Sequence, residues 1–325
     1  MIDRPVIDQP AISSPMEIRV AKIRLTLRVL RDAWGIFVES KIGLLGLAII
    51  LFFALMAISY PVLRATVWDD VVNGIAVYDP VTGFAFDQAE QPASPSWAHP
   101  LGTDSLGRDV LSQLMASTSS EFLLGITAAA FTLIIATTVG AVSAYYGGIV
   151  DAFFMRVADL VIALPGLSLL IVLGALFGLN LLQLGIVIGV LSGFGGTAII
   201  LKSQALSITV KPYIEAARVA GGSQRHIIMA HIIPNLLPLS LLYMMFTVTG
   251  AIFSEAVLSF FGILDIRMSW GIMIHTASTG GYLLGGTRYW WLIVPAGASI
   301  TFLSSAFYLV GRALDEVANP RLRSR

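Results

Sequence analysis

Residues 121–146 read Glu-Phe-Leu-Leu-Gly-Ile-Thr-Ala-Ala-Ala-Phe-Thr-Leu-Ile-Ile-Ala-Thr-Thr-Val-Gly-Ala-Val-Ser-Ala-Tyr-Tyr, and the only charged residue is the first. A helix needs about 20 mostly apolar residues to cross a hydrocarbon core of about 30 Å. This stretch meets that requirement and predicts a transmembrane helix. Five further stretches of the same kind lie at residues 43–63, 157–178, 183–201, 237–262 and 290–311. The sequence therefore predicts an all-α integral membrane protein with six transmembrane helices.

The overall composition agrees with this prediction. Of 325 residues, 56% are hydrophobic and 12% are charged, whereas soluble globular proteins carry about 25% charged residues. The formal net charge is zero, which argues against a nucleic-acid partner, because phosphate binding needs a clustered basic excess. The chain has no cysteine, and its four histidines lack the HExxH spacing. We therefore expect no thiol chemistry and no metal site.

The distribution of Lys and Arg predicts the orientation of the six helices. If both termini are cytoplasmic, the cytoplasmic segments hold 16 of these residues and the outer segments hold 4. Basic residues are enriched in the cytoplasmic segments of membrane proteins. We therefore expect an N-in, C-in, multi-pass protein of the cell membrane.

The spans also divide the chain into segments. Within the N-terminal lead, residues 17–34 place apolar residues at helical spacing among arginines, which predicts an amphipathic helix in the inner headgroup region. An ordinary basic lead is the alternative. The expected order is a cytoplasmic lead at 1–42, a first span at 43–63, an extracytoplasmic segment at 64–120, a five-helix core at 121–311 with a cytoplasmic loop at 204–236, and a cytoplasmic tail at 312–325.

The long cytoplasmic loop carries the most informative sequence. Residues 211–235 read Lys-Pro-Tyr-Ile-Glu-Ala-Ala-Arg-Val-Ala-Gly-Gly-Ser-Gln-Arg-His-Ile-Ile-Met-Ala-His-Ile-Ile-Pro-Asn. Pro212 suits the first turn of a helix, Gly221 and Gly222 suit its end, and Ser223 can cap a second helix. These residues leave two readings open. The loop is either a helical hairpin that only connects two spans, or a short helix that docks into a groove of another protein.

This loop resembles the EAA signature of ABC importer permeases. The pattern Glu215-Ala-Ala-x-x-x-Gly221, followed after nine residues by His231-Ile-Ile-Pro-Asn235, is similar to that of the dipeptide, oligopeptide and nickel permeases. The match is specifically to their second, C-type subunit. In that family the loop is the coupling helix that sits in a groove of the ATPase subunit, so the resemblance favours the docking reading.

The resemblance covers roughly residues 30–321. It includes the outer signature His99-Pro-Leu-Gly-Thr-Asp-Ser-Leu-Gly-Arg-Asp-Val110, the Tyr146-Gly-Gly bend into the third span, Leu258-Ser-Phe-Phe-Gly262 at the end of the fifth, and Asn319-Pro-Arg321 in the tail. Between Gly262 and Ser269 the family's longer, proline-containing insert is replaced by Ile-Leu-Asp-Ile-Arg-Met. That loop faces the binding-protein side, so the departure bears on the substrate class.

The resemblance implies the fold of a type I ABC importer permease that forms the translocation pathway with a second permease, most simply as a heterodimer. Two ABC ATPase subunits would dock on the loops, an extracytoplasmic solute-binding protein would deliver cargo, and lipid would surround the spans. The chain has no P-loop motif, so it would be no enzyme and would hold no cofactor, and ATP and Mg would be bound by the ATPases. Dipeptides or oligopeptides are the expected cargo, with oligosaccharides or nickel as alternatives. A stand-alone secondary transporter is the rival class.

Within the loop, the resemblance assigns ATPase coupling to Glu215, Ala216, Ala217, Arg218, Gly221, Arg225, His231, Pro234 and Asn235. Glu215 would either pair with a basic residue of the ATPase or cap the helix amides. Arg218 and Arg225 would be solvated or would belong to the interface. His231 and Asn235 flank Pro234 and could satisfy backbone groups that the proline leaves free.

Two charged features of the spans complete the candidate residues. Arg156 and Asp159, three residues apart at the entrance of the third span, predict a structural ion pair. Glu255 is the one carboxylate that the sequence places deep in a span, and it must face the bundle, another subunit or water. Pathway lining and a buried hydrogen bond to a neighbouring helix are both open for it.

The outer segments yield two structural expectations. Thr103 and Asp104, followed by Arg108, predict a helix cap with an ion pair four residues apart. Trp290 and Trp291 are expected to be interfacial or surface aromatics.

Overall fold

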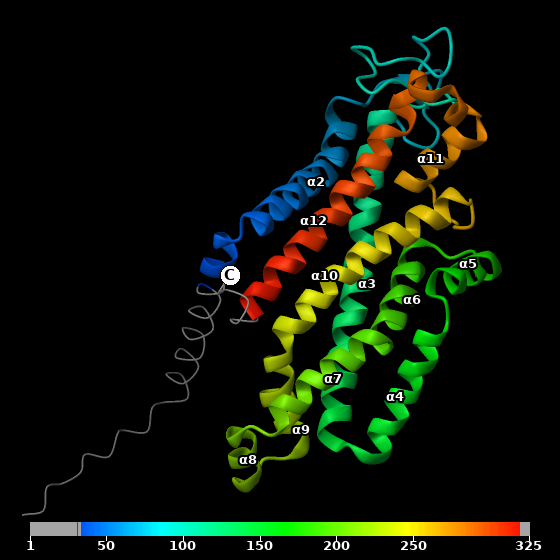
Figure 1. The fold of residues 1–325 in the computed structure, drawn as a ribbon. Helices are drawn as coiled ribbons and strands as arrows, with labels where there is room; N and C mark the ends of the chain where they lie inside the picture. Colours follow the sequence, from blue (N-terminus) through cyan, green and yellow to red (C-terminus); the bar gives the residue numbers. More distant parts are fainter. Residues whose placement is uncertain (1–30, 32–33, 319–325) are drawn as a thin grey trace, which may run out of the picture.

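The computed structural model is predominantly helical (Figure 1). It describes residue 31 and residues 34–318, so most of the expected amphipathic helix at 17–34 and the tail motif at 319–321 lie outside the described residues. Four helices are long and apolar enough to cross a membrane: α2 (Lys41–Thr66), α3 (Val110–Tyr146), the continuous helix Gln224–Phe260, and α12 (Val294–Ala318). The all-α, multi-pass prediction is confirmed.

Two further pairs of apolar helices are bent. Helices α4 (Gly148–Ala163) and α5 (Gly166–Phe177) meet at 82°, and helices α6 (Leu181–Phe194) and α7 (Gly196–Thr209) meet at 42°. If each bent pair is one span, the described residues hold the six spans that the sequence predicts. The first bend lies at Pro165, which cannot donate a backbone hydrogen bond and forces the preceding Leu164 into an extended conformation.

The remaining elements lie at the two ends of the helix bundle. One end carries the residues between α2 and α3, here called the lobe (67–109), together with α11 (Trp270–Thr279) and the 3₁₀ segment η2 (Tyr282–Leu292). The opposite end carries α8 (Pro212–Val219) and α9 (Gln224–Ile227), which lead through the π-helical turn η1 (Ile228–Ile232) into α10 (Ile233–Phe260) (Figure 1). The candidate docking loop and the lobe are therefore at opposite ends of the molecule.

Helix α3 begins 11 residues before the predicted span at 121–146. Its N-cap is Asp109, whose Oδ1 accepts a hydrogen bond from the Ser112 N–H at 2.7 Å. Within the helix, the hydroxyls of Ser117 and Thr118 donate to backbone carbonyls four residues earlier. The helix thus extends before the predicted span, because these polar side chains are satisfied inside the helix and do not end it.

Helix α3 is the centre of the bundle, and a row of glycines lets α6 pack closely against it. A Cβ added at Gly185, Gly189 or Gly193 would lie 2.9 Å or less from atoms of α3. These glycines are four residues apart and therefore share one face of α6. Close packing through small residues is typical of helix pairs in membranes.

Helix α2 packs antiparallel on α12 in the same manner. An added Cβ at Gly43 would meet Ala313, and one at Gly46 would meet the carbonyl oxygen of Ala306. The beginning of α2 and the end of α12 consequently lie side by side, at the end of this pair that faces away from the lobe (Figure 1).

The lobe contains a small hairpin of β1 (Val71–Val72) and β2 (Ile75–Ala76), joined by Asn73 and Gly74 at positive φ, as a two-residue hairpin turn requires. The lobe is attached to the helices by Trp291, which is 6% exposed and donates its indole N–H to the carbonyl of Thr103 at 3.1 Å. The interfacial role predicted for Trp291 was wrong, because this ring belongs to the core beneath the lobe.

Candidate functional site

Local sequence signals determine the structure of the candidate docking loop. Pro212 is the first residue of α8, and Ile214 is fully buried against Ile208, Ile227 and Ile232, which fixes α8 against the bundle. At its C-terminus, Gly222 N–H donates to Ala217 O at 3.0 Å and Gly221 N–H to Arg218 O at 3.1 Å. This bond pair is a Schellman motif. Gly221 has φ of 83°, a left-handed conformation that favours glycine.

The second part of the loop is a helix with one wide turn. The hydroxyl of Ser223 caps α9 by accepting from His226 N–H at 3.3 Å, as predicted. The helix then passes through the π turn η1 and continues into α10 past Pro234. The side chain of Asn235 donates to the carbonyl of His231 at 2.6 Å, so it binds a backbone group in the turn before Pro234.

The surface of α8 is open in this chain. Glu215 and Ala216 are exposed, Ala217 is half-buried, and Val219 is 84% exposed. Glu215 accepts no hydrogen bond from the helix amides and has no ion-pair partner in the part of the chain that the structure describes. Its carboxylate is therefore available to a partner.

The basic and imidazole groups of the loop differ in their surroundings. The guanidinium of Arg218 lies 5.6 Å from the ring centre of Tyr145 at the end of α3, whereas Arg225 is exposed. The ring of His231 lies 5.6 Å from that of His226 and 6.4 Å from that of Tyr213, so it packs within the hairpin. Arg218 and His231 help to hold the loop to the bundle and to itself.

Two ion pairs lie on α4. The pair predicted between Arg156 and Asp159 is present at 3.3 Å, with both side chains more than half exposed. A second pair, which the sequence did not indicate, joins Lys202 Nζ of α7 to Asp151 at 2.7 Å, and both side chains are partly buried. This contact fixes the beginning of α4 to α7.

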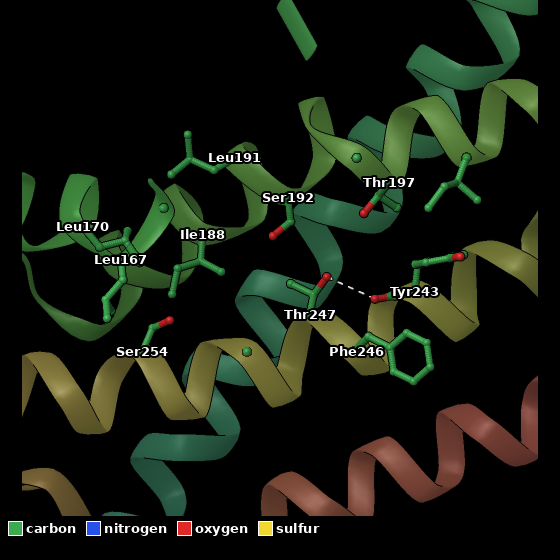
Figure 2. Close-up of a pocket in the computed structure, with 14 residues that line it drawn as sticks. Leu167, Leu170, Ile188, Leu191, Ser192, Thr197, Tyr243, Phe246, Thr247 and Ser254 are labelled. Atoms are coloured by element: carbon green, nitrogen blue, oxygen red, sulfur yellow. Dashed lines mark hydrogen bonds between the residues drawn. The ribbon is translucent and has the colours of Figure 1, made fainter. Parts of the chain in front are cut away.

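A cavity of about 510 Å³ lies between α5, α6, α7 and α10 (Figure 2). Its wall combines aliphatic side chains with the hydroxyls of Ser192, Thr197, Tyr243, Thr247 and Ser254, and the lining includes no charged side chain. The hydroxyl of Thr247 donates to the carbonyl of Tyr243 at 3.1 Å (Figure 2).

Both helix breaks open onto this cavity. Gly166 and Leu167 follow the break between α4 and α5, Gly196 and Thr197 follow the break between α6 and α7, and all four line the cavity. Irregular backbone at membrane depth is tolerated where it is buried in protein or lines a water-filled space. The breaks therefore border a region of the bundle that is lined by hydroxyl groups.

Glu255 does not line this cavity. Its side chain is fully buried between α10 and α3, where it accepts a hydrogen bond from the hydroxyl of Ser259 and meets the carboxyl of Glu121. The sequence placed Glu255 alone at its depth, and this was wrong: Glu121 is fully buried beside it. The hydrogen bond from Ser259 lies within α10 itself, so both roles considered for Glu255, pathway lining and a hydrogen bond to a neighbouring helix, stay predictions.

The lobe contains a second buried polar cluster, centred on His99. The imidazole is 1% exposed, with Nδ1 2.9 Å from Asp109 Oδ2 and Nε2 3.1 Å from Asp87 Oδ1. Burial by itself lowers the pKa of His99, but the hydrogen bonds and negative charges of Asp109 and Asp87 outweigh it and raise this pKa above its usual value. A protonated ring donates to both carboxylates.

The neighbouring Asp104 forms the predicted ion pair but not the predicted cap. Its Oδ2 accepts from Arg108 Nε at 2.7 Å and from Gln113 Nε2 at 2.9 Å, and its Oδ1 accepts from the N–H of Leu106 and Arg108. The helix cap is Asp109, five residues later. Asp104 closes a turn before the helix and pairs with Arg108, whereas Asp109 caps the helix.

The polar groups inside the molecule that the sequence did not indicate are Glu121, His99 and the hydroxyls of the cavity. The quoted stretch 99–110 contains both His99 and Asp109, but a separation of ten positions is no spacing from which their contact could be inferred. Glu121 stands at the edge of an apolar run, where a charged residue is usually solvated.

Comparisons with known proteins agree with this architecture. The family model described as "Binding-protein-dependent transport system inner membrane component" matches residues 136–324, and that described as "N-terminal TM domain of oligopeptide transport permease C" matches residues 29–72. The chain is 31% identical over 303 residues to the dipeptide transport system permease protein DppC of Bacillus subtilis, covering 92% of this chain and 88% of that protein.

Two oligopeptide transport system permease proteins OppC are also similar. The protein of Bacillus subtilis is 31% identical over 301 residues, which cover 92% of each chain. The protein of Haemophilus influenzae is 34% identical over 227 residues, which cover 69% of this chain and 71% of that protein.

Proposed function

Because this chain belongs to the family of binding-protein-dependent transport system inner membrane components, we propose that it is the permease subunit of an ABC importer that takes up dipeptides or oligopeptides. The observation that carries the proposal is the cavity lined by hydroxyls and aliphatic side chains. A hydroxyl can donate to a peptide carbonyl or accept from a peptide N–H. Such a wall can bind the backbone that all peptides share, and it does not discriminate between charged and neutral side chains of the cargo.

The cavity is one wall of a pathway that a second permease completes. Gly166, Leu167, Gly196 and Gly250 are exposed in the single chain although they lie at breaks or in membrane-spanning helices. Lipid cannot satisfy broken backbone or hydroxyl groups. A related permease subunit, together with water, would cover this face in the assembled transporter.

Helix α8 is the contact site for an ATPase subunit. The exposed carboxylate of Glu215 lies beside small residues that permit close approach, and the exposed Val219 and Val210 add apolar surface. The buried Ile214 and the Schellman motif make α8 a rigid body. ATP-driven movement of the ATPases would thus be passed directly to α7 and α10, which adjoin the loop.

The lobe is the outer end of the molecule. The 16-to-4 distribution of basic residues supports an N-in, C-in orientation, in which the lobe at 67–109 lies opposite α8 (Figure 1). An extracytoplasmic solute-binding protein would deliver peptides there.

The test is uptake of labelled dipeptides, oligopeptides and oligosaccharides by cells that express the complete transport system. We expect uptake of peptides. Gly221→Val and Glu215→Ala should reduce both uptake and co-purification of the ATPases, because a non-glycine residue pays about 1–2 kcal/mol in the left-handed conformation and Ala removes the exposed carboxylate. Gly297→Ala, in a helix position with nothing within 4 Å of the added Cβ, is the control.

Two results would contradict the proposal, and they are separable. If the cells take up oligosaccharides but not peptides, the proposed cargo class is wrong, whereas the assignment as a permease still holds. Normal ATPase retention and normal transport in both loop variants would refute the docking role of α8.

A further inference from the structure

Two carboxyl groups meet inside the bundle between α3 and α10. Glu121 lies three turns into α3, Glu255 lies near the lobe end of α10, and both side chains are 0% exposed. The residues Leu124, Ile252 and Leu258, each three positions away from one of the pair along its helix, are also fully buried. The helices run antiparallel here, and Gly125, one turn after Glu121, packs on Val248.

The hydrogen bonding of the pair is incomplete if both groups are ionised. Ser259 donates to Oε1 of Glu255, and Ser269 lies within interaction distance of the same carboxyl. The other three oxygens, both of Glu121 and Oε2 of Glu255, have no hydrogen-bond donor among the described residues. Each of these carboxyls has the other as its nearest charged neighbour.

Among the residues that the structure describes, no cation lies beside the pair. Apart from Glu121 and Glu255, helices α3 and α10 contain no charged residue, and α5 and α6 contain none. The charges of α2 are at its two ends, where Arg64 pairs with Asp79. On α11, His275 contacts the carbonyl of Phe260 through Nδ1. Asp265 and Arg267, in the segment before α11, line a separate surface pocket.

An ionised carboxylate only accepts hydrogen bonds, and two adjacent carboxylates repel each other strongly in a medium of low dielectric constant. A single proton relieves both problems, because it removes one charge and converts one carboxyl into a donor to the other. We propose that Glu121 and Glu255 form a proton-binding site between α3 and α10, and that the pair holds at least one proton at neutral pH. Loss of this proton would place two like charges between the helices and weaken their contact.

Infrared spectroscopy of the purified, complete transport complex tests the site directly. Wild type at neutral pH should show the carbonyl band of a buried protonated carboxylic acid, and the double variant Glu121→Gln/Glu255→Gln should lose it. Glu90→Gln, which removes an exposed carboxyl of the lobe, should leave the band unchanged. Absence of the band in wild type, with a bound alkali or alkaline-earth cation detected by elemental analysis, would overturn the proposal.

The stability of the complex provides a second readout that does not require the double variant to assemble. The melting temperature of wild type should fall as pH rises into the alkaline range, since the pair then loses its last proton. The single variant Glu121→Gln should show a smaller fall, because only one charge can form. If the melting temperature falls equally with rising pH in wild type and in Glu121→Gln, the proposed site is refuted.

Discussion

The contact between α3 and α6 makes a quantitative prediction about Gly189. A Cβ at this position would lie 2.5 Å from the Cβ of Phe131 and 2.7 Å from the carbonyl oxygen of Ala128, whereas carbon atoms in favourable contact are about 3.5–4.0 Å apart. The helices must therefore separate by about 1 Å, and one of the atoms that must move is backbone. Overpacking of this kind costs about 1–3 kcal/mol, so Gly189→Ala should lower the free energy of unfolding by that amount.

Gly297→Ala on α12 is the matched control, since nothing lies within 4 Å of its added Cβ. Replacing a helical glycine by alanine at an open position stabilises by about 0.5–1 kcal/mol. The unfolding of the purified protein in detergent can be followed by circular dichroism. The free energy of unfolding should be equal to or higher than that of wild type in Gly297→Ala and lower in Gly189→Ala. If both variants shift stability in the same direction by the same amount, the close α3–α6 contact does not exist as described.

Two further predictions concern the lobe and the orientation. The raised pKa of His99 means that its stabilising contribution is complete below the ordinary histidine pKa of about 6.5 and is lost as pH rises through the raised value. Hydrogen-exchange protection factors in the lobe, which are corrected for the pH dependence of intrinsic exchange, should therefore fall over that range in wild type and stay nearly constant in His99→Gln. Constant protection factors in wild type would contradict the assignment. Single cysteines at Ser94 and Ser223 should react with a membrane-impermeant reagent only from outside and only from the cytoplasm, respectively, and external labelling at Ser223 would refute the N-in, C-in orientation.

The features that the sequence predicted well are those determined by local chemistry. Pro212, Gly221 and Ser223 begin, end and cap helices through bonds that span three to five residues, so their roles are visible in the chain itself. The apolar stretches likewise predicted the spans, because crossing a membrane depends mainly on length and hydropathy.

The features that were missed depend on contacts between distant residues. The start of α3 was placed too late because Ser117 and Thr118 look like loop residues until their hydroxyls are seen to bond the helix carbonyls. That error removed Glu121 from the interior, and the pair with Glu255 depends on the antiparallel alignment of two helices more than 100 residues apart.

The wide π turn at Ile228–Ile232 determines where the helix can tolerate the deletion of a residue. An α-helix has 3.6 residues per turn, so removing one residue from a regular stretch of α10 would rotate everything beyond the deletion by about 100°. The wide turn holds one residue more than a regular turn, so a deletion within it can be absorbed by reverting to ordinary helix. The angular relation between the exposed face of α8 and the hydroxyls of Tyr243, Thr247 and Ser254 would then be preserved. Within the described helix Gln224–Phe260, the segment 228–232 is thus the stretch in which one residue can be removed without rotating the side chains that follow.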